Sequence, residues 1–276
     1  MNRFQYTTKD LINFLKINGI KKNSNIFIHS SWQQFYNYKG SVHELLKALI
    51  EEFGVKGTIA MPSYFPYRIG INKEIIGKIL TDKNIIFDIK KTPTMAGILP
   101  EEFRRLKNVF RSVDRHSVCA YGVNADYLVN EHKNSLTHWD KFSPYFKLSK
   151  INATVITLGV GSKFVGTIMH CADSILRNKL KYFNQFFTKK IIHRFRLENN
   201  KLFEKTVLVH DDNFYYKFNY NNHSNLIYKF YDKKFFKRRF FSNLAINFYD
   251  ANYFINKTIE LAKKGIVFYT YPIFKK

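Results

Sequence analysis

The stretch ATVITLGVG, residues 153–161, carries the clearest fold signal in this sequence. Residues 153–158 form an apolar, β-branched run of the length of a buried strand. The glycines that follow permit a tight turn, and a helical pattern then runs from about Thr167 to Leu176. A strand that passes through a glycine turn into a helix is typical of α/β folds, so this stretch predicts that class.

The first half of the chain repeats the same alternation. An apolar run at 25–28 ends in a polar His-Ser-Ser sequence, and a second run at 57–61 stops at Pro62. Helical patterns begin after a capping Thr-Thr-Lys-Asp sequence and after Gly40, and each of them ends at a glycine. We therefore expect a mixed central sheet flanked by helices, with polar residues placed at strand ends.

Residues 180–241 have a different texture, rich in aromatic and basic side chains. Short apolar runs at 206–210 and 213–216 predict an antiparallel β insertion with helical pieces. A final helix is expected over about 251–263. The prediction is one domain over residues 1–276, with a β-rich, basic C-terminal subregion that forms a divergent insertion at about 180–241.

The composition excludes several classes of protein. A chain of 276 residues that is 45% hydrophobic and 17% aromatic can bury a large core and is not disordered. No apolar run reaches the ~18 residues that a membrane span needs, and the N-terminus lacks the apolar core of a signal peptide. We therefore expect a cytoplasmic protein without a membrane span. Cys119 and Cys171 are too few for a disulfide framework or a thiolate metal site, so no metal is expected.

The formal net charge is +24, and the excess of Lys and Arg is larger after residue 150 than before it. Such a field attracts anions: nucleic acid, anionic lipid or a phosphate-bearing small molecule. A second explanation stands beside it, because Lys, Asn, Ile, Phe and Tyr are all abundant here and all have AT-rich codons. Residues 233–241 interleave cations with phenylalanines, which suits single-stranded nucleic acid or, as we favour, a helix with its cations in solvent. No nucleic-acid partner is therefore expected.

Three segments could bind a phosphate-bearing ligand. The His-Ser-Ser sequence at 29–31 ends a strand, where ligands bind in open α/β sheets, although its hydroxyls could equally start a turn. Residues 92–95 precede a helix, whose N-terminus suits phosphate, and ordinary N-capping would use the same threonines. Residues 111–117 hold two arginines and a histidine, and arginine can bind phosphate through paired hydrogen bonds, although a solvated turn would have the same composition.

The strongest catalytic candidate is His170, which lies on the helix after the glycine turn. Asp173 is three residues further on, so both side chains share one helix face. A carboxylate that orients an imidazole and stabilises its charged form is the usual layout of a general base. Lone histidines on helices are more often structural, but the turn and the carboxylate spacing favour a catalytic role here.

Taken in chain order, these motifs resemble the aminoglycoside 3-N-acetyltransferase family. The matching segments are His-Ser-Ser (29–31), Gly-Thr-Ile-Ala-Met-Pro (57–62), Phe-Asp (87–88), Thr-Pro-Thr through Glu-Phe-Arg (92–104), Arg-Ser with His-Ser-Val (111–118), Ser-Pro (143–144), Leu-Gly-Val-Gly (158–161) and Thr-x-x-His-x-x-Asp (167–173). The match covers about residues 8–176, with a weaker echo at 244–274. So many motifs in the family's order make chance agreement an unsatisfactory explanation.

The resemblance implies a reaction and the residues that perform it. Members transfer an acyl group from acyl-CoA to an amine on a sugar, with the histidine of the Thr-x-x-His helix, here His170, as the base and Asp173 beside it. The coenzyme A channel would be lined by His29, Ser30, Ser31, Met61, Thr94, Met95, Arg111, Ser112 and His116. We expect its phosphates near Arg111, Ser112 and the helix start at Thr94.

This sequence departs from the family's pattern where the acceptor should bind. Segment 111–117 is one residue shorter and lacks the family's proline and first histidine, Asp173 replaces a glutamate, and 180–241 has no counterpart. Aminoglycosides are polycations, whereas the net charge favours an anionic acceptor. We therefore expect a nucleotide-linked amino sugar, as in polysaccharide biosynthesis, with acetylation of aminoglycosides and antibiotic resistance as the alternative. The oligomeric state is left open, and a homo-oligomer is compatible with the sequence.

Overall fold

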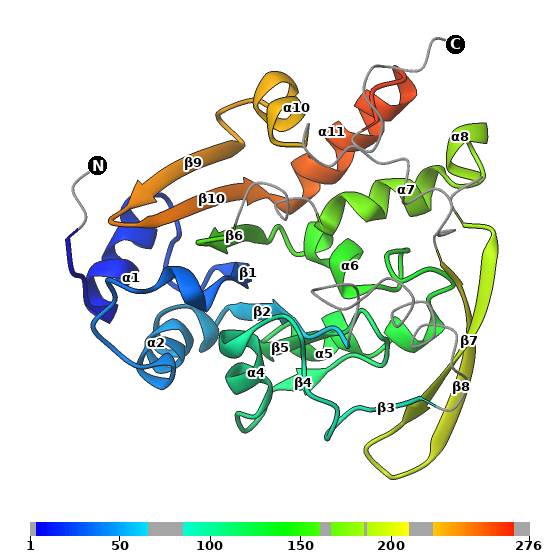
Figure 1. The fold of residues 1–276 in the computed structure, drawn as a ribbon, viewed down its shortest axis with the longest axis horizontal. Coiled ribbons are helices and arrows are strands. Elements are labelled where there is room, and N and C mark those ends of the chain that lie inside the picture. Colours follow the sequence, from blue (N-terminus) through cyan, green and yellow to red (C-terminus); the bar gives the residue numbers. More distant parts are fainter. Residues whose placement is uncertain (1–3, 66–84, 161–166, 185–186, 210–222, 268–276) are drawn as a thin grey trace.

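The computed structural model describes residues 4–65, 85–160, 167–184, 187–209 and 223–267. A seven-stranded sheet runs through its centre (Figure 1). In spatial order its strands are β4 (Phe110–Arg111), β5 (Val118–Gly122), β2 (Thr58–Pro62), β1 (Asn25–Ser30), β6 (Thr154–Leu158), β10 (Leu244–Asp250) and β9 (Phe236–Phe241). Strands β2, β1 and β6 are parallel to one another and the other neighbouring pairs are antiparallel, so the predicted mixed sheet is confirmed.

Helices cover both faces of this sheet because its central strands are apolar on both sides. In β1, Ile26 and Ile28 belong to one core with α1, α2 and α4, whereas Phe27 belongs to a second core with α5, α6, α7 and α11 (Figure 1). The helices are α1 (Thr8–Ile17), α2 (Val42–Leu49), α4 (Ile98–Arg104), α5 (Ala125–Val129), α6 (Pro144–Lys150), α7 (His170–Leu176), α8 (Lys181–Asn184), α10 (His223–Phe230) and α11 (Ala251–Lys263). Shorter helical turns are η1 (Trp32–Gln34), η2 (Ile50–Gly54), η3 (His132–Asn134) and η5 (Thr167–Met169).

The helix boundaries follow the capping signals in the sequence. Thr7 and Ser41 each form a reciprocal capping box, with Asp10 and Glu44 respectively, at the starts of α1 and α2. The last helix, α11, spans Ala251–Lys263 as expected, and Gly265 follows it with a φ of +80°. At these helices the local sequence marks the start of α1 and α2 and the end of α11.

A second sheet of three strands lies apart from the first. Strand β3 (Ile86–Asp88) pairs in parallel with β7 (Lys189–Arg196), and β7 pairs with β8 (Leu202–Val209) in the long hairpin at the right of Figure 1. One face of the hairpin is buried and carries Ile191 and Phe195 on β7 and Val207 on β8. The antiparallel pieces predicted for this region are therefore present.

Two expectations for the C-terminal region need revision. Residues 233–241 were expected to be helical, but Phe236–Phe241 form strand β9 at the edge of the central sheet. The helical prediction is wrong because this segment and β10 form a hairpin, closed by a tight turn in which Ser242 has a φ of +51°. The end of the expected insertion thus belongs to the central sheet. The runs at 213–216 and beyond residue 267 lie outside the described residues.

Within the described ranges, no helix combines the length and hydrophobicity that crossing a membrane requires. Close backbone packing occurs where the end of β5 meets the segment between η2 and β2. There Gly122 has a φ of +107°, and a Cβ atom added to it would collide with the carbonyl oxygens of Gly57 and Gly54. Gly19 has nearly the same φ, +102°, but a Cβ there would meet no atom within 4 Å.

These two glycines give a matched test of the packing. Both Gly→Ala variants should lose roughly 1–2 kcal/mol of stability from the left-handed backbone. Gly122→Ala should lose about 1–3 kcal/mol more, because the new methyl group forces a backbone shift. Urea unfolding of the two variants measures the difference. Equal losses of stability in the two variants would contradict the close packing described at the end of β5.

Candidate active site

His170 and Asp173 lie together at the start of α7. The His170 Nδ1 and the Asp173 Oδ2 are 3.0 Å apart, and the side chains are 16% and 3% exposed. Because the carboxylate oxygen accepts, Nδ1 is the nitrogen that carries the hydrogen, and the lone pair of the neutral ring is on Nε2. The i,i+3 spacing thus produces the carboxylate–imidazole pair that the sequence predicts.

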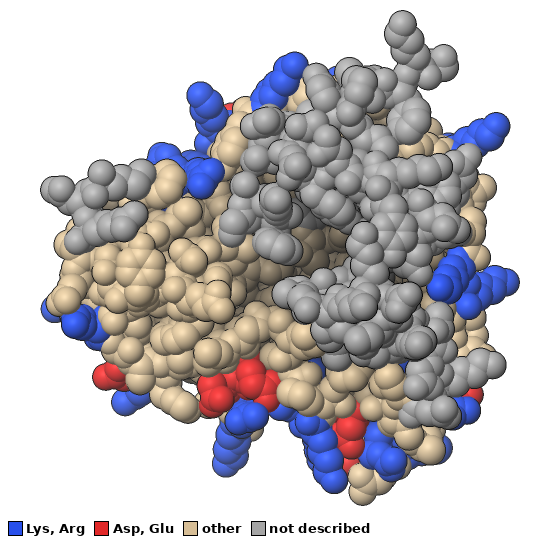
Figure 2. Space-filling model, viewed as in Figure 1, with Lys and Arg blue, Asp and Glu red and all other residues tan. Residues whose placement is uncertain are grey.

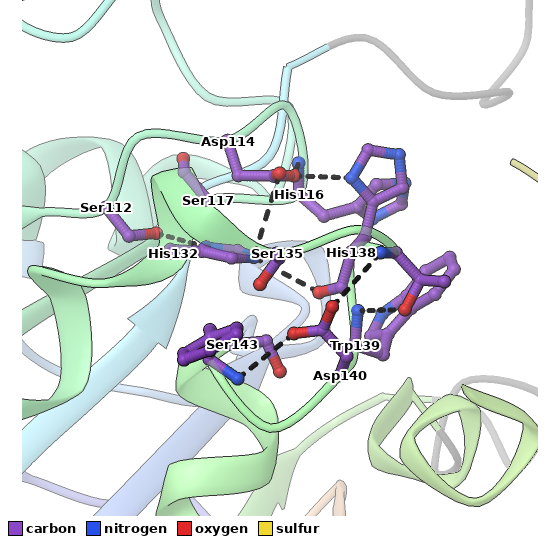
Figure 3. Close-up of polar contacts among 12 residues, drawn as sticks. Ser112, Asp114, His116, Ser117, His132, Ser135, His138, Trp139, Asp140 and Ser143 are labelled. Atoms are coloured by element: carbon purple, nitrogen blue, oxygen red, sulfur yellow. Dashed lines mark hydrogen bonds and ion pairs between the residues drawn. The ribbon is translucent and has the colours of Figure 1, made fainter. Parts of the chain in front are cut away.

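The indole of Trp139 packs on the imidazole of His170. Their ring centroids are 4.6 Å apart, with an interplanar angle of 36°. Trp139 lies in the loop before α6, and this loop is folded around Asp140, which is drawn in Figure 3. The Asp140 carboxylate accepts hydrogen bonds from the backbone N–H groups of Leu136, Thr137 and Phe142. The loop conformation therefore fixes the indole, and the indole limits the positions available to the His170 ring.

Three more histidines extend this aromatic contact into the interior. His116 lies 4.7 Å from Trp139 and 4.4 Å from His138, measured between ring centroids. His138 lies 5.3 Å from Trp139 in a T-shaped arrangement and is stacked on His193 at 5.6 Å. All of these rings except that of His170 are at most 8% exposed. The result is a buried row of imidazoles that ends at the partly exposed His170.

Asp114 contacts this row of imidazoles through His138, and its side chain is fully buried. Its carboxylate accepts hydrogen bonds from the His138 Nδ1 at 2.6 Å, the Lys205 Nζ at 2.5 Å and the backbone N–H of His116 at 2.8 Å. Figure 3 shows Asp114 facing both His138 and His132. Burial alone would raise the pKa of Asp114, but the neighbouring His138, Lys205 and His132 outweigh it and hold the pKa well below its usual range.

Burial lowers the pKa of the interior histidines. It brings the pKa of His29 to about 4, that of His132 to about 3 and that of His193 to about 2. For His116 burial and then the neighbouring His138 lower the pKa well below its usual value. These four rings are therefore neutral at ordinary pH, and their protonation is costly in the folded protein.

The Arg111 and Ser112 side chains, predicted to lie near the phosphates of coenzyme A, both bond to other parts of the chain. The Arg111 guanidinium donates to the carbonyl oxygens of Ser63, Ile89 and Thr92 and to the Ser117 hydroxyl, and its side chain lies over the Phe87 ring. Burial lowers its pKa to about 10. The Ser112 hydroxyl donates to the His132 Nδ1, whose ring donates from Nε2 to the His138 carbonyl. A phosphate would have to displace these bonds, so both side chains hold neighbouring loops in place.

Thr94 and Met95 line a shallow pocket of about 370 Å³ with Gly97, Ile98, Glu101 and Glu102. The Thr94 hydroxyl and the Met95 N–H both donate to the Tyr64 carbonyl, and the Thr94 N–H donates to Glu101. Arg104 pairs with the same Glu101 carboxylate at 2.6 Å, and these contacts lower the pKa of Glu101 to about 2 against the opposing effect of burial. The segment before α4 is thus rigidly held.

The other expected coenzyme A residues surround the end of β1. Ser30 and Ser31 are half-buried there, and the Ser30 carbonyl lies 3.8 Å from the position of a Cβ added to Gly97 in the pocket. Among the described residues, the buried Ser30 hydroxyl has no hydrogen-bond partner. His29 and Met61 are buried, and Met61 lies in the core under α4 rather than in the pocket.

Sequence reasoning missed the roles of Asp114, His138, Trp139, His193 and Lys205. A signal for two of them exists, because His193 and Lys205 occupy inward positions of β7 and β8, between apolar residues. A histidine opposite a lysine on the buried face of a hairpin indicates a buried polar network. Among the described residues, no group of His, Cys, Asp or Glu is arranged to hold a metal ion.

Figure 2 shows a hollow near the centre of this face of the molecule. The described residues that border it in this view are neither basic nor acidic, whereas Lys and Arg lie at the periphery. The described Lys and Arg side chains seen in this view therefore lie away from the hollow.

The mixed α/β fold thus places a carboxylate-paired imidazole beside a buried polar network. A sequence profile described as aminoglycoside 3-N-acetyltransferase matches residues 27–262. The chain therefore belongs to the aminoglycoside 3-N-acetyltransferase family, as its motifs indicate.

Individual relatives agree with this assignment. Aminoglycoside N(3)-acetyltransferase IV from Salmonella sp. is 25% identical over 173 residues, a match that spans 62% of this chain and 60% of that protein, less than two thirds of its length. Among solved structures, AAC-IIIb in binary complex with CoASH is 17% identical with a TM-score of 0.75, covering 95% of this chain and 98% of that one. AAC-VIa bound to sisomicin is 18% identical with a TM-score of 0.74, covering 94% and 98%.

YokD from Bacillus subtilis is 20% identical to this chain, with a TM-score of 0.71 and coverage of 95% of this chain and 94% of that one. At such identities these structures establish a shared fold. The layout of the sheet and helices described above is therefore that of the family.

The buried histidines predict a steep loss of stability in acid. An unfolded histidine binds a proton near its usual pKa of about 6.5, whereas the folded pKa of His29, His116, His132 and His193 is lower. Stability from these groups is thus complete above about pH 6.5 and falls by about 1.4 kcal/mol per pH unit for each of them as the pH decreases. Unfolding is expected at roughly pH 4–5 for a protein of ordinary stability.

One of these residues can be removed without breaking a hydrogen bond. Within the described part of the chain, neither nitrogen of the buried His193 ring has a hydrogen-bond partner, so His193→Phe should keep the stacking and reduce the acid slope by about 1.4 kcal/mol per pH unit. His43, whose side chain is 71% exposed, provides the control His43→Gln, which should leave the slope unchanged. Urea titrations at several pH values measure both slopes. An unchanged slope in His193→Phe would refute the buried-histidine explanation.

Proposed function

We propose that this protein transfers an acetyl group from acetyl-CoA to an amino group of an aminoglycoside. The observation that carries the proposal is the His170–Asp173 pair, held at 3.0 Å in a chain that belongs to the aminoglycoside 3-N-acetyltransferase family. Two relatives are described by their ligands, coenzyme A in one and sisomicin in the other. Together these features support a sugar amine as acceptor and a coenzyme A thioester as donor.

The chemistry of the pair suits this reaction. An amine attacks a thioester carbonyl only in its neutral form, and the nitrogen loses a further proton as the amide forms. The Nε2 of His170 accepts that proton, and the Asp173 carboxylate orients the ring and stabilises its positive charge. The thioester supplies an activated acyl carbon and a thiolate leaving group, whose sulfur is protonated as the carbon–sulfur bond breaks. Amide, free thiol and the original base are the products.

The donor is proposed to bind between the end of β1 and the start of α4. The pocket lined by Thr94, Met95 and Gly97 is adjacent to Ser30, whose buried hydroxyl lacks a partner among the described residues. These groups fit the pantetheine arm, which has amide groups and an apolar chain. In this proposal Arg111 and Ser112 hold the neighbouring loops in place and do not bind the donor directly, because their polar atoms already bond to the protein.

The choice of acceptor rests on two opposing arguments. The family and its named relatives favour an aminoglycoside. The net charge of +24 favours an anionic, nucleotide-linked amino sugar. We give the first more weight, since the described residues that border the hollow in Figure 2 are uncharged and the composition of the genome can account for many lysines. The nucleotide-linked acceptor is retained as the second candidate.

Replacing His170 tests its role as the base. His170→Asn should leave the affinity for coenzyme A nearly unchanged, because the ring acts on the amine. The single-turnover rate should fall on the order of 10²–10⁴-fold, the usual effect of a positioned base. The deficit should shrink at higher pH, where more of the amine is already neutral. Asp173→Asn should reduce the single-turnover rate less, because the side-chain amide still orients the ring.

His29 and His116 are the rival bases and serve as controls. Both are buried with a lowered pKa, so they are poor proton acceptors in the folded protein. If His170→Asn keeps its single-turnover rate while His29→Asn or His116→Asn loses it, the assignment of the base is wrong.

The acceptor can be identified from the salt dependence of the reaction. The long-range field of a protein of charge +24 repels a polycationic aminoglycoside on its approach, whatever the local potential at the site, so its KM should decrease as ionic strength rises from low to physiological values. A nucleotide-linked amino sugar should show the opposite trend. We expect measurable acetyl-CoA consumption with sisomicin or apramycin and none with a uridine-diphosphate-linked amino sugar. The reverse pattern would show that the acceptor is a nucleotide-linked amino sugar and that the aminoglycoside proposal is wrong.

A further inference from the structure

Lys205 is a buried cation on the second sheet. It occupies an inward position of β8, opposite His193 on β7, and its side chain is only 7% exposed. Its Nζ donates to the Asp114 carboxylate at 2.5 Å and to the carbonyl oxygen of His132 at 3.0 Å, with the Ser135 carbonyl at 3.5 Å. The three N–H bonds of the ammonium group are thus directed at three separate acceptors.

These acceptors lie in two loops connected to the central sheet and its helices. Asp114 is in the turn between β4 and β5. His132 is the first residue of η3 and Ser135 follows η3, just before the loop with His138 and Trp139. A single side chain of the second sheet therefore joins both loops. The contact is long-range, since Lys205 and Asp114 are 91 residues apart in the sequence.

A continuous series of contacts leads from this ion pair to the proposed base. Asp114 holds the His138 ring through Nδ1 at 2.6 Å and the backbone of His116 at 2.8 Å. Both imidazoles pack on Trp139, at 5.3 and 4.7 Å. Trp139 in turn packs on the His170 ring at 4.6 Å. Any displacement of the Asp114 carboxylate would therefore be transmitted to the indole and then to His170.

We propose that Lys205 and Asp114 are positioning residues for the transfer reaction. Their buried ion pair fixes His138, His116 and Trp139, and through them the plane of the His170 imidazole. The β7–β8 hairpin is on this account part of the catalytic architecture. The inference deepens the proposed function and relies on it for the kinetic readout, but the position of Trp139 can be measured independently of activity.

A purely structural role is the competing explanation. Removing one partner of a buried ion pair leaves an uncompensated charge and destabilises the fold, whereas replacing both partners by apolar residues of similar size is often neutral or stabilising. The double variant Asp114→Leu with Lys205→Met therefore separates the two explanations. It removes both charges and also the acceptor that holds His138 and His116.

The experiment compares the double variant with wild type and with Lys205→Met alone. We expect the double variant to unfold cooperatively near the wild-type temperature but to lose kcat on the order of 10²-fold, as for a misplaced catalytic group. Its KM for acetyl-CoA should change less than about twofold, because neither residue lines the proposed donor pocket. In a Trp32→Phe background, the emission of Trp139 should shift to the red as the indole loses its fixed packing.

The matched control is Glu204→Gln. Glu204 neighbours Lys205 on β8 but faces solvent and pairs with Arg194 at 2.6 Å, with 53% of its side chain exposed. This variant should keep kcat and the emission of Trp139. A folded double variant with wild-type kcat and unshifted emission would overturn the positioning role. If wild type acetylates no amino sugar, the proposed function fails, and the emission of Trp139 still decides whether Lys205 and Asp114 position the indole.

Discussion

The buried carboxylate of Asp114 is the constraint on which the site depends. A charge without solvent is tolerated only when paired and hydrogen-bonded, and removal of one partner typically costs about 3–5 kcal/mol. Asp114 meets this requirement with Lys205 from the second sheet, His138 from the loop before α6 and a backbone N–H from its own turn. Three parts of the chain must therefore come together at one point, and the site takes its shape from that convergence.

The sequence predicts the parts of the fold that depend on local signals. The helix starts predicted at Thr7–Asp10 and after Gly40, the strand at 154–158 and the shared helix face of His170 and Asp173 all appear in the structure. What the sequence could not predict depends on contacts between distant residues. Arg111 reads as a phosphate ligand in isolation, yet its guanidinium binds three carbonyl groups from segments that only the fold brings near it.

Strand β9 is a second feature that depends on contacts between residues outside its own segment. Residues 236–241 alternate poorly between apolar and polar side chains, so their pattern suits a helix as well as a strand. Pairing with β10 decides the outcome, because the hairpin extends a sheet that is already formed by β6 and its neighbours. The net charge is similarly ambiguous, since +24 is a sum over the whole chain and the local potential at a site depends on the charges close to it.

The central claim is that His170, paired with Asp173, takes the proton from the acceptor amine. A crystal structure of the protein with coenzyme A and an aminoglycoside tests it most directly. The account predicts that the His170 Nε2 lies within hydrogen-bond reach of the reacting amine, about 2.6–3.2 Å or one water molecule away. The free thiol should point at the same nitrogen. An acceptor amine placed against His138 or His116, with His170 out of reach, would contradict the account.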